Sequence, residues 1–235
     1  MLKIKNLSKS YQKGTFAVED LSLNVKAGEI YGFVGHNGAG KSTTIKAIVG
    51  ALGFDSGEIL INGKSISSQP VEAKYDLAYI PDNPDVYEYL TGIQYINFVC
   101  DVYGVGDERA EKIEKYATDF QIKDNLGDLI SSYSHGMKQK LVLISALVHS
   151  PKLLVLDEPF VGLDPIASFR LKEIMKELCK NGSAIFFSSH VLEVVEKLCD
   201  RVGIIKKGKL VIEGKMQEII GDKSLEKLFL EIADE

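Results

Sequence analysis

The chain has 235 residues, of which 45% are hydrophobic and 26% are charged, and its formal net charge is -5. This length and composition suit a globular protein with one large α/β domain or two closely packed lobes. A mildly acidic chain argues against a protein that holds nucleic acid through bulk positive charge, so we expect no nucleic-acid partner. Met1 to Tyr11 lacks the apolar segment of a signal peptide. The longest nearly apolar run, Leu141 to Val148, is much shorter than the roughly 18 residues that a membrane-spanning helix needs.

The first third of the chain alternates strand-like runs with glycine-containing turns. A helix is predicted from Lys41 to Val49, and Gly50 would end it. Four runs have the alternating or continuous apolar pattern of strands: Leu2 to Leu7, Asp20 to Val25, Glu29 to Val34 and Glu58 to Ile61.

The middle third, about residues 91–149, changes to helical periodicity. Ala110, Ile113, Ala117 and Phe120 recur at helical spacing between charged residues. We interpret this segment as a helical lobe inserted into a core of about residues 1–90 and 150–220, with the whole chain forming one domain.

The last third returns to alternating strands and helices. Pro165 precedes a predicted helix from Ile166 to Cys179, and the acidic segment from Ser224 to Glu235 predicts a solvated terminal helix. Strands are predicted at Leu153 to Leu156, Ala184 to Phe187 and Val202 to Ile205, and at Leu210 to Ile212 after a turn at Lys207 to Lys209.

The cysteines Cys100, Cys179 and Cys199 are widely spaced and form no C-x-x-C pair. We therefore expect buried or half-buried free thiols rather than a disulfide or a metal site. The histidines likewise lack the H-x-x-x-H spacing of a metal site.

A phosphate-binding loop is predicted between the strand that ends at Val34 and the helix that begins at Lys41. The segment fits G-x-x-x-x-G-K-[ST], in which glycines let backbone N–H groups point at phosphates, lysine contacts the β and γ oxygens, and the hydroxyl binds Mg²⁺. The sequence therefore predicts a P-loop NTPase core that binds ATP and Mg²⁺. The expected nucleotide-binding residues are Gly35, His36, Asn37, Gly38, Ala39, Gly40, Lys41, Ser42 and Thr43.

Two carboxylates follow the apolar run Leu153 to Leu156, at the edge of the sheet where ligands bind in α/β proteins. Asp157 is expected to bind Mg²⁺, and Glu158 to act as the general base that activates water. Acidic residues at a strand end also cap the next element, but the P-loop in the same chain favours the catalytic interpretation.

Further motifs occur in a fixed order along the chain: Tyr133 to Met137, Gly162 to Asp164 and Ser188 to His190. With the P-loop and the acidic strand end, they resemble the signature motif, the D-loop and the switch segment of ATP-binding cassette (ABC) transporter nucleotide-binding domains. The resemblance extends from Leu2 to about Gly214. It implies an α/β fold with a mixed sheet, an N-terminal antiparallel β portion and the inserted helical lobe.

The resemblance also implies roles for individual residues. His190 would contact the γ-phosphate as a second catalytic residue, and Tyr11 would stack on adenine. Ser134, Gly136 and Asp164 would contact the ATP held by a second subunit. Each has an ordinary structural alternative: a helix N-cap for Ser134, a core hydrogen bond for His190 and simple packing for Tyr11.

Two motifs depart from the family pattern. Asp82 stands where the Q-loop usually has glutamine, and its carboxylate would either bind the metal or repel the γ-phosphate. His135 stands where glycine is usual, and Met137 replaces the final glutamine of the signature. This variant resembles the exporter branch that supplies separate ATPase subunits to small permeases. Aromatic residues between Asn83 and Tyr95 either pack within the lobe or receive the permease.

The family resemblance implies a homodimer or heterodimer of ATPase subunits that closes on ATP and drives an integral-membrane permease. It places the protein in the cytoplasm, peripheral on the inner face of the cell membrane. Two alternatives stay open. One is a soluble ABC-type ATPase that acts on a ribosome, DNA or a cofactor-assembly complex. The other is a binding module without activity, which the presence of Lys41, Glu158 and His190 disfavours.

Overall fold

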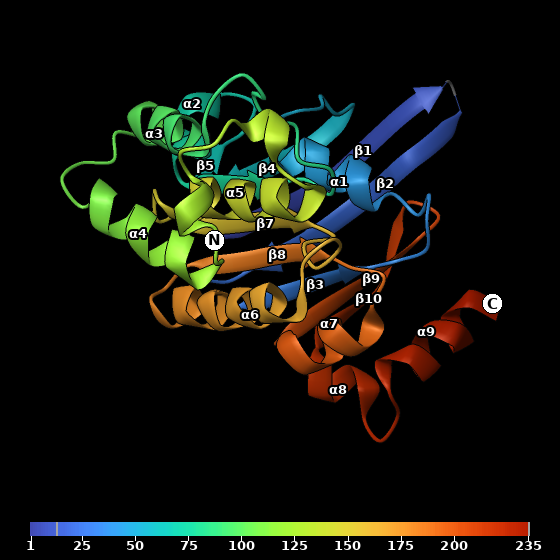
Figure 1. Cartoon of the computed structure of the whole chain (residues 1–235). Helices are drawn as coiled ribbons and strands as arrows, with labels where there is room; N and C mark the ends of the chain where they lie inside the picture. The colour runs from blue at the N-terminus through green and yellow to red at the C-terminus, as the bar shows by residue number, and fades with distance from the viewer. Residues whose placement is uncertain (13, 235) are drawn as a thin grey trace.

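The structure is a computed structural model that describes residues 1–12 and 14–234. Within these residues the strands form a six-stranded sheet and a four-stranded sheet, with helices on the outer faces (Figure 1). The six-stranded sheet has the order β10-β9-β3-β8-β7-β6, and only the β9–β10 pair is antiparallel. Its strands are β3 (Ile30–Val34), β6 (Leu77–Ile80), β7 (Leu153–Asp157), β8 (Ala184–Ser188), β9 (Arg201–Lys206) and β10 (Lys209–Lys215).

The central strands are apolar along their whole length because both faces of the sheet are covered. All residues of β3, β7 and β8 are buried. Successive residues of β8 enter different cores: Phe186 packs in one buried cluster and Phe187 in the other. The functional loops that leave these strands are therefore held between two packed layers.

The four-stranded sheet covers one of these two cores. It is antiparallel, in the order β2-β1-β4-β5, with strands β1 (Leu2–Gln12), β2 (Thr15–Val25), β4 (Ser56–Ile61) and β5 (Lys64–Ser65). Leu2, Ile4 and Leu7 of β1 point into the core while the lysines between them are exposed. This is the alternation of a sheet that has one solvated face.

The predicted lobe, residues 91–149, contains α3 (Gly92–Tyr103), α4 (Arg109–Asp119), two short 3-10 turns and α5 (His135–Leu147). Thr91 and Gln94 form a reciprocal capping box at the start of α3. Of the four residues at helical spacing, Ile113, Ala117 and Phe120 are buried, whereas Ala110 is exposed at the start of α4. The remaining helices are α1 (Lys41–Ile48), α2 (Pro70–Tyr75), α6 (Pro165–Lys180), α7 (Leu192–Leu198), α8 (Met216–Ile220) and α9 (Leu225–Asp234).

The structure contains each predicted strand and helix, with ends that differ by a few residues. The prediction that the last helix is solvated was wrong. Leu225 of α9 is fully buried, and Leu228, Phe229 and Ile232 pack against the larger core. The acidic composition hid an apolar stripe at helical spacing. Glu235 lies outside the described residues.

The cysteine prediction is confirmed for the described chain, in which Cys100, Cys179 and Cys199 are buried free thiols. Burial raises the pKa of Cys179 to about 12, so this thiol stays protonated at neutral pH. Among the helices of residues 1–12 and 14–234, none has the length and hydropathy needed to span a bilayer.

Candidate functional site

The P-loop connects the buried strand β3 to helix α1, and at two of its positions steric crowding explains why the residue is glycine. Gly40 has a φ of 111°, and a Cβ there would lie 2.5 Å from the carbonyl oxygen of Ala17. A Cβ on Gly35 would lie 2.5 Å from the carbonyl oxygen of Ile205. Because neither position has room for a side chain, the loop wraps tightly, in the conformation that lets a P-loop point backbone N–H groups at an anion.

Lys41 is buried at the centre of this loop. Its Nζ donates hydrogen bonds to the carbonyl oxygens of Gly35, at 2.6 Å, and His36, at 3.3 Å. Burial lowers the pKa of Lys41, and the charges of Glu158 and Asp157 oppose this shift. The loop therefore keeps a poorly hydrated ammonium in place for a negatively charged partner.

A hollow of about 480 Å³ lies over the P-loop. Tyr11 stands at its edge with 63% of its surface exposed, and its hydroxyl is 3.3 Å from Oγ1 of Thr43. The exposed ring offers a flat apolar face beside the loop, as binding of a planar base requires. The hollow is lined by Tyr11, Ala17, His36, Asn37, Gly38, Gly40, Lys41, Ser42 and Thr43.

The two carboxylates at the end of β7 have different environments. Asp157 is buried and pairs with Ser188 of the neighbouring strand, whose Oγ donates a 2.5 Å hydrogen bond to Oδ1. Glu158 has a φ of 50°, and its backbone N–H donates to the carbonyl oxygen of Ser188. The left-handed conformation of Glu158 turns the chain sharply after the strand, as is common at functional sites.

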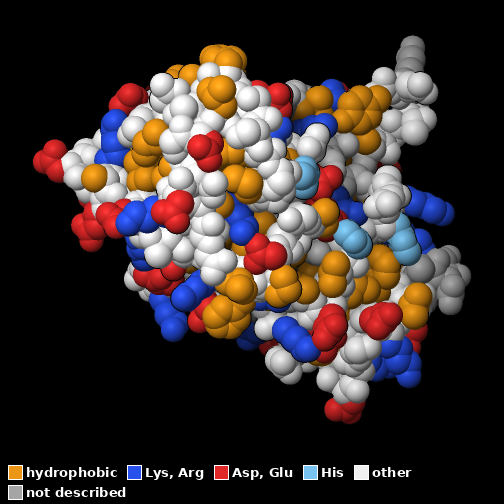
Figure 2. Space-filling model, in the orientation of Figure 1, with side chains coloured by type: hydrophobic (Ala, Val, Ile, Leu, Met, Phe, Trp, Pro, Cys, Tyr) orange, Lys and Arg blue, Asp and Glu red, His pale blue; other side chains and the backbone are white. Residues whose placement is uncertain are grey.

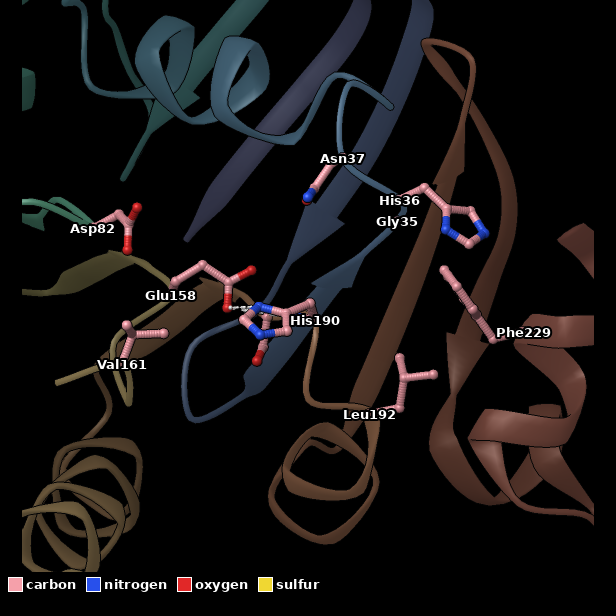
Figure 3. A pocket seen from close by; sticks show the side chains of 10 residues that line it. Gly35, His36, Asn37, Asp82, Glu158, Val161, His190, Leu192 and Phe229 are labelled. Carbon is pink, nitrogen blue, oxygen red and sulfur yellow. Dashed lines mark hydrogen bonds and ion pairs between the residues drawn. The ribbon is translucent and has the colours of Figure 1, made fainter. Parts of the chain in front are cut away.

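The side chains of Glu158 and His190 contact each other across the loops that follow β7 and β8. Nδ1 of His190 is 2.9 Å from Oε2 of Glu158, and the backbone N–H of His190 donates to the same oxygen at 3.2 Å. The carboxylate is mostly buried, whereas 60% of the His190 side chain is exposed. Figure 3 shows both side chains facing a shared space with Asp82 and Asn37.

This space is a cleft of about 500 Å³ next to the P-loop. Asp82, at the Q-loop position, is on its wall. Burial, together with the nearby charges of Asp157 and Asp82, raises the pKa of Tyr79 to about 12, which shows that Asp157 in β7 and Asp82 after β6 both lie near Tyr79. The cleft is lined by Gly35, His36, Asn37, Asp82, Glu158, Val161, Ser189, His190, Leu192 and Phe229.

Most of the predicted site residues line one of the two hollows. Five of them line neither hollow: Ala39, Ser134, Gly136, Asp157 and Asp164. Ala39 belongs to the P-loop and Asp157 directly precedes Glu158, whereas Ser134, Gly136 and Asp164 belong to other motifs. Ser134 is the N-cap of α5 and accepts a hydrogen bond from the N–H of Met137. Asp164 is the N-cap of α6 and also forms a 2.6 Å ion pair with Lys140.

The signature turn, which is the segment Tyr133 to Met137 of the signature motif, contacts the D-loop, Gly162 to Asp164, within one chain. A Cβ added to Gly162, which has a φ of 80°, would lie 2.9 Å from the His135 ring. A Cβ on Gly136 would lie 3.0 Å from the carbonyl oxygen of Gly162. The unusual His135 therefore occupies the space that glycine at 162 leaves open.

This contact predicts that Gly162→Ala destabilises the fold by about 2–4 kcal/mol, through left-handed backbone strain and overpacking against His135. Gly182→Ala is a matched control, because Gly182 has a φ of 92° and no described neighbour within 4 Å of the added Cβ. Urea unfolding should show that the control loses about 1–2 kcal/mol of its free energy of unfolding. Adding His135→Ala to the Gly162→Ala chain should remove the additional loss that Gly162→Ala shows over this control. Equal losses for the two alanine variants would contradict the contact.

Sequence reasoning gave no site role to Ser188, Val161, Leu192 or Phe229. Ser188 was within a quoted motif, but its bond to Asp157 depends on the β7–β8 register. Val161 and Leu192 are next to quoted motifs, so their proximity in sequence could have indicated them. Phe229 is far from every motif, and no sequence signal links it to the cleft.

Comparisons with known proteins agree with the family resemblance seen in the sequence motifs. The family model described as ABC transporter matches residues 18–161. The lantibiotic transport ATP-binding protein SrtF of Streptococcus pyogenes is 36% identical, over 97% of this chain and 96% of that protein. The linearmycin resistance ATP-binding protein LnrL of Bacillus subtilis is 36% identical, over 93% of this chain and 70% of that protein.

Solved structures agree with the sequence comparisons. The structure of an ATP binding subunit of an ABC transporter has a TM-score of 0.96 and 34% identity, and the match covers 99% of each chain. The P-loop, the acidic strand end and the mixed sheet with its antiparallel portion are thus those of a known family. The chain belongs to the ABC transporter family, and it is an ATP-binding, ATP-hydrolysing subunit that powers a membrane transporter.

Proposed function

We propose that the chain hydrolyses ATP with the Glu158–His190 pair and, as a dimer, drives an exporter whose permease is a separate polypeptide. The observation that carries the catalytic part is the 2.9 Å contact between Glu158 and His190 at the wall of a cleft next to the P-loop. A carboxylate beside a phosphate-binding loop is the arrangement that activates water in phosphoryl transfer. We further propose that residues 91–149 act as a helical lobe within this single ATPase domain.

The P-loop residues Gly35 to Thr43 bind the phosphates of ATP in this proposal, and Tyr11 stacks on adenine. Lys41 supplies the cation: phosphate oxygens replace the carbonyl oxygens that its Nζ now contacts. The exposed ring of Tyr11 and the hollow over the loop support this orientation.

Mg²⁺ would be held by Ser42, Asp157 and Asp82 together with the phosphates. The donor set fits, because hydroxyl and carboxylate oxygens suit Mg²⁺ and such sites use one or two carboxylates plus substrate phosphates. Asp157 is buried and fixed by Ser188, and Asp82 lines the same cleft as Glu158. When bound, the ion neutralises charge that develops on the β and γ phosphates.

Hydrolysis then proceeds with Glu158 as general base. Its carboxylate accepts a proton from water as the water oxygen attacks the γ-phosphorus and the bond to ADP breaks. His190 holds the Glu158 carboxylate through Nδ1 and its backbone N–H, and its exposed ring would contact the γ-phosphate.

Ser134, Gly136 and Asp164 act on the ATP of a second subunit in this proposal. They line neither hollow of their own chain, whereas the capped N-terminus of α5 is an anion-binding feature. A head-to-tail dimer would bring that helix end to the partner's P-loop. The Lys140–Asp164 pair and the His135–Gly162 contact support a signature turn and D-loop that move as one unit.

The permease would dock on exposed aromatic residues that follow Asp82 in the chain. Tyr87, Tyr89 and Phe98 are 48%, 76% and 47% exposed, and the Tyr87 ring lies 5.9 Å from each of the other two ring centroids. An exposed aromatic cluster of this kind suits a protein interface. The subunit would then sit in the cytoplasm, on the inner face of the membrane.

The names of the relatives support export, since one is a linearmycin resistance protein and another a lantibiotic transport protein. The test is to tag the chain in its native cell, solubilise the membranes in mild detergent and identify what co-purifies. A multi-span protein in a fixed ratio, lost in a Tyr87→Ala/Tyr89→Ala variant, would support the proposal. A chain that brings down ribosomes, DNA or a cofactor-assembly complex instead would contradict the transport role.

A further inference from the structure

Helix α9 lies against the nucleotide cleft. The ring of Phe229 packs on the ring of His36, with centroids 4.6 Å apart and planes at 45°. Figure 3 shows the Phe229 side chain extending from α9 towards His36 in the P-loop, on the same side of the cleft as Leu192. The contact joins the second residue of the P-loop to a helix near the other end of the chain.

The helix that carries Phe229 is fixed at both ends. At its start the backbone N–H of Leu225 donates a 2.7 Å hydrogen bond to Glu196 in α7. Near its end the carbonyl oxygen of Ile232 accepts a 2.5 Å hydrogen bond from Nζ of Lys206, the last residue of β9. Phe229 is half-buried and packs on the larger core, so it offers its ring from a rigid support.

Figure 2 shows one face of the molecule, on which α6, α7 and α9 lie. Histidine side chains gather on the same face as a strip of hydrophobic side chains that runs over α6, α7 and α9. His36 is an exposed residue of the P-loop. The Phe229 ring therefore supplies a packing contact that a side chain at an exposed loop position usually lacks.

His36 has a direct effect on the shape of the P-loop. Its carbonyl oxygen accepts from the N–H of Ala39 at 3.1 Å and from Nζ of Lys41 at 3.3 Å. The peptide that follows it carries the N–H of Asn37, which lines both hollows. Restricting the His36 side chain therefore restricts the backbone groups that meet the phosphates, which lowers the ordering cost of binding.

We propose that Phe229 is a positioning residue for ATP: by packing on His36 it holds the P-loop in the shape that binds phosphates. The inference rests on the proposed function, in which Gly35 to Thr43 bind the nucleotide. The contact recorded for the Phe229 ring is with His36 of the P-loop, so we expect its effect to fall on nucleotide affinity rather than on the chemical step.

The test compares steady-state ATP hydrolysis of the full chain and its variants. Phe229→Ala is expected to raise KM for ATP about three- to tenfold, the range of one aromatic contact, with kcat within about twofold of wild type. Phe229→Tyr keeps a ring on His36 and should restore KM. Leu230→Ala, at a position 57% exposed on the same helix, should leave KM unchanged.

Two further variants separate positioning from loss of folding. Phe229→Leu keeps apolar packing on the core and is expected to retain the wild-type Tm while still raising KM. His36→Ala should raise KM to a similar extent, and the double variant His36→Ala/Phe229→Ala should show no further increase, because both changes remove one contact. Additive effects, or a wild-type KM in both Phe229→Ala and Phe229→Leu, would overturn the proposal.

Equilibrium ATP binding, measured in a Glu158→Gln background, gives the same comparison without turnover. If the Glu158→Gln chain binds ATP, and adding a Phe229 substitution leaves its ATP affinity unchanged, the result would contradict this inference alone. A parent chain that binds no ATP would contradict the proposed function and, with it, the inference.

Discussion

Replacing Glu158 with glutamine is expected to slow ATP hydrolysis by about 10²- to 10⁴-fold while ATP binding stays close to wild type. The amide cannot accept the proton of the attacking water, whereas the P-loop and Tyr11 are not altered. Phosphate release should report the first effect and equilibrium nucleotide binding the second. The same variant should accumulate as an ATP-bound dimer on gel filtration, because the closed state is no longer resolved by hydrolysis.

Glu193→Gln is the matched control, since Glu193 is a highly exposed carboxylate in α7, close in sequence to His190, and pairs only with Lys197 among the described residues. It should hydrolyse ATP at the wild-type rate. Equal turnover by Glu158→Gln and wild type would remove Glu158 from the catalytic role. A monomer at saturating ATP and high protein concentration would count against the dimer.

Lys41→Met is expected to weaken ATP binding by about 10- to 100-fold, because a charge-assisted hydrogen bond to phosphate is lost. The same change should leave the Tm unchanged or raise it. Burial lowers the pKa of Lys41, so at neutral pH the folded chain holds a charged group that the unfolded chain solvates better. Removing that charge takes away a cost of folding.

Lys46→Met, in the same helix but at an exposed position, should change neither quantity. Isothermal titration with ATP and a thermal melt, each run on the three chains, measure both effects. A Lys41→Met chain that binds ATP within about twofold of wild type would show that the ammonium contributes little to phosphate binding.

The parts of the site that could be predicted are those encoded by neighbouring residues. The P-loop follows from glycine spacing between a strand and a helix, and the acidic pair from its place after an apolar run. Parallel pairing of β7 with β8 places the ends of the two strands side by side, which brings Asp157 and Ser188 together. Even so, the 2.5 Å hydrogen bond between them requires a register that periodicity alone does not give.

The parts of the site that could not be predicted depend on packing between elements that are distant in sequence. The Phe229–His36 contact and the Lys140–Asp164 ion pair each join elements that no local pattern relates. The wrong prediction for α9 has the same origin. Net charge describes a whole segment, whereas the burial of Leu225, Leu228 and Ile232 depends on one face of the helix and on the core that receives it.

The contact between His135 and Gly162 has a consequence for how this sequence can change over time. A side chain at 162 requires a smaller residue at 135 first, whereas a smaller residue at 135 can arise while glycine at 162 remains. The order of substitution is therefore constrained in one direction. Descendants of this chain that keep histidine at 135 are therefore expected to keep glycine at 162, whereas glycine at 162 does not require histidine at 135.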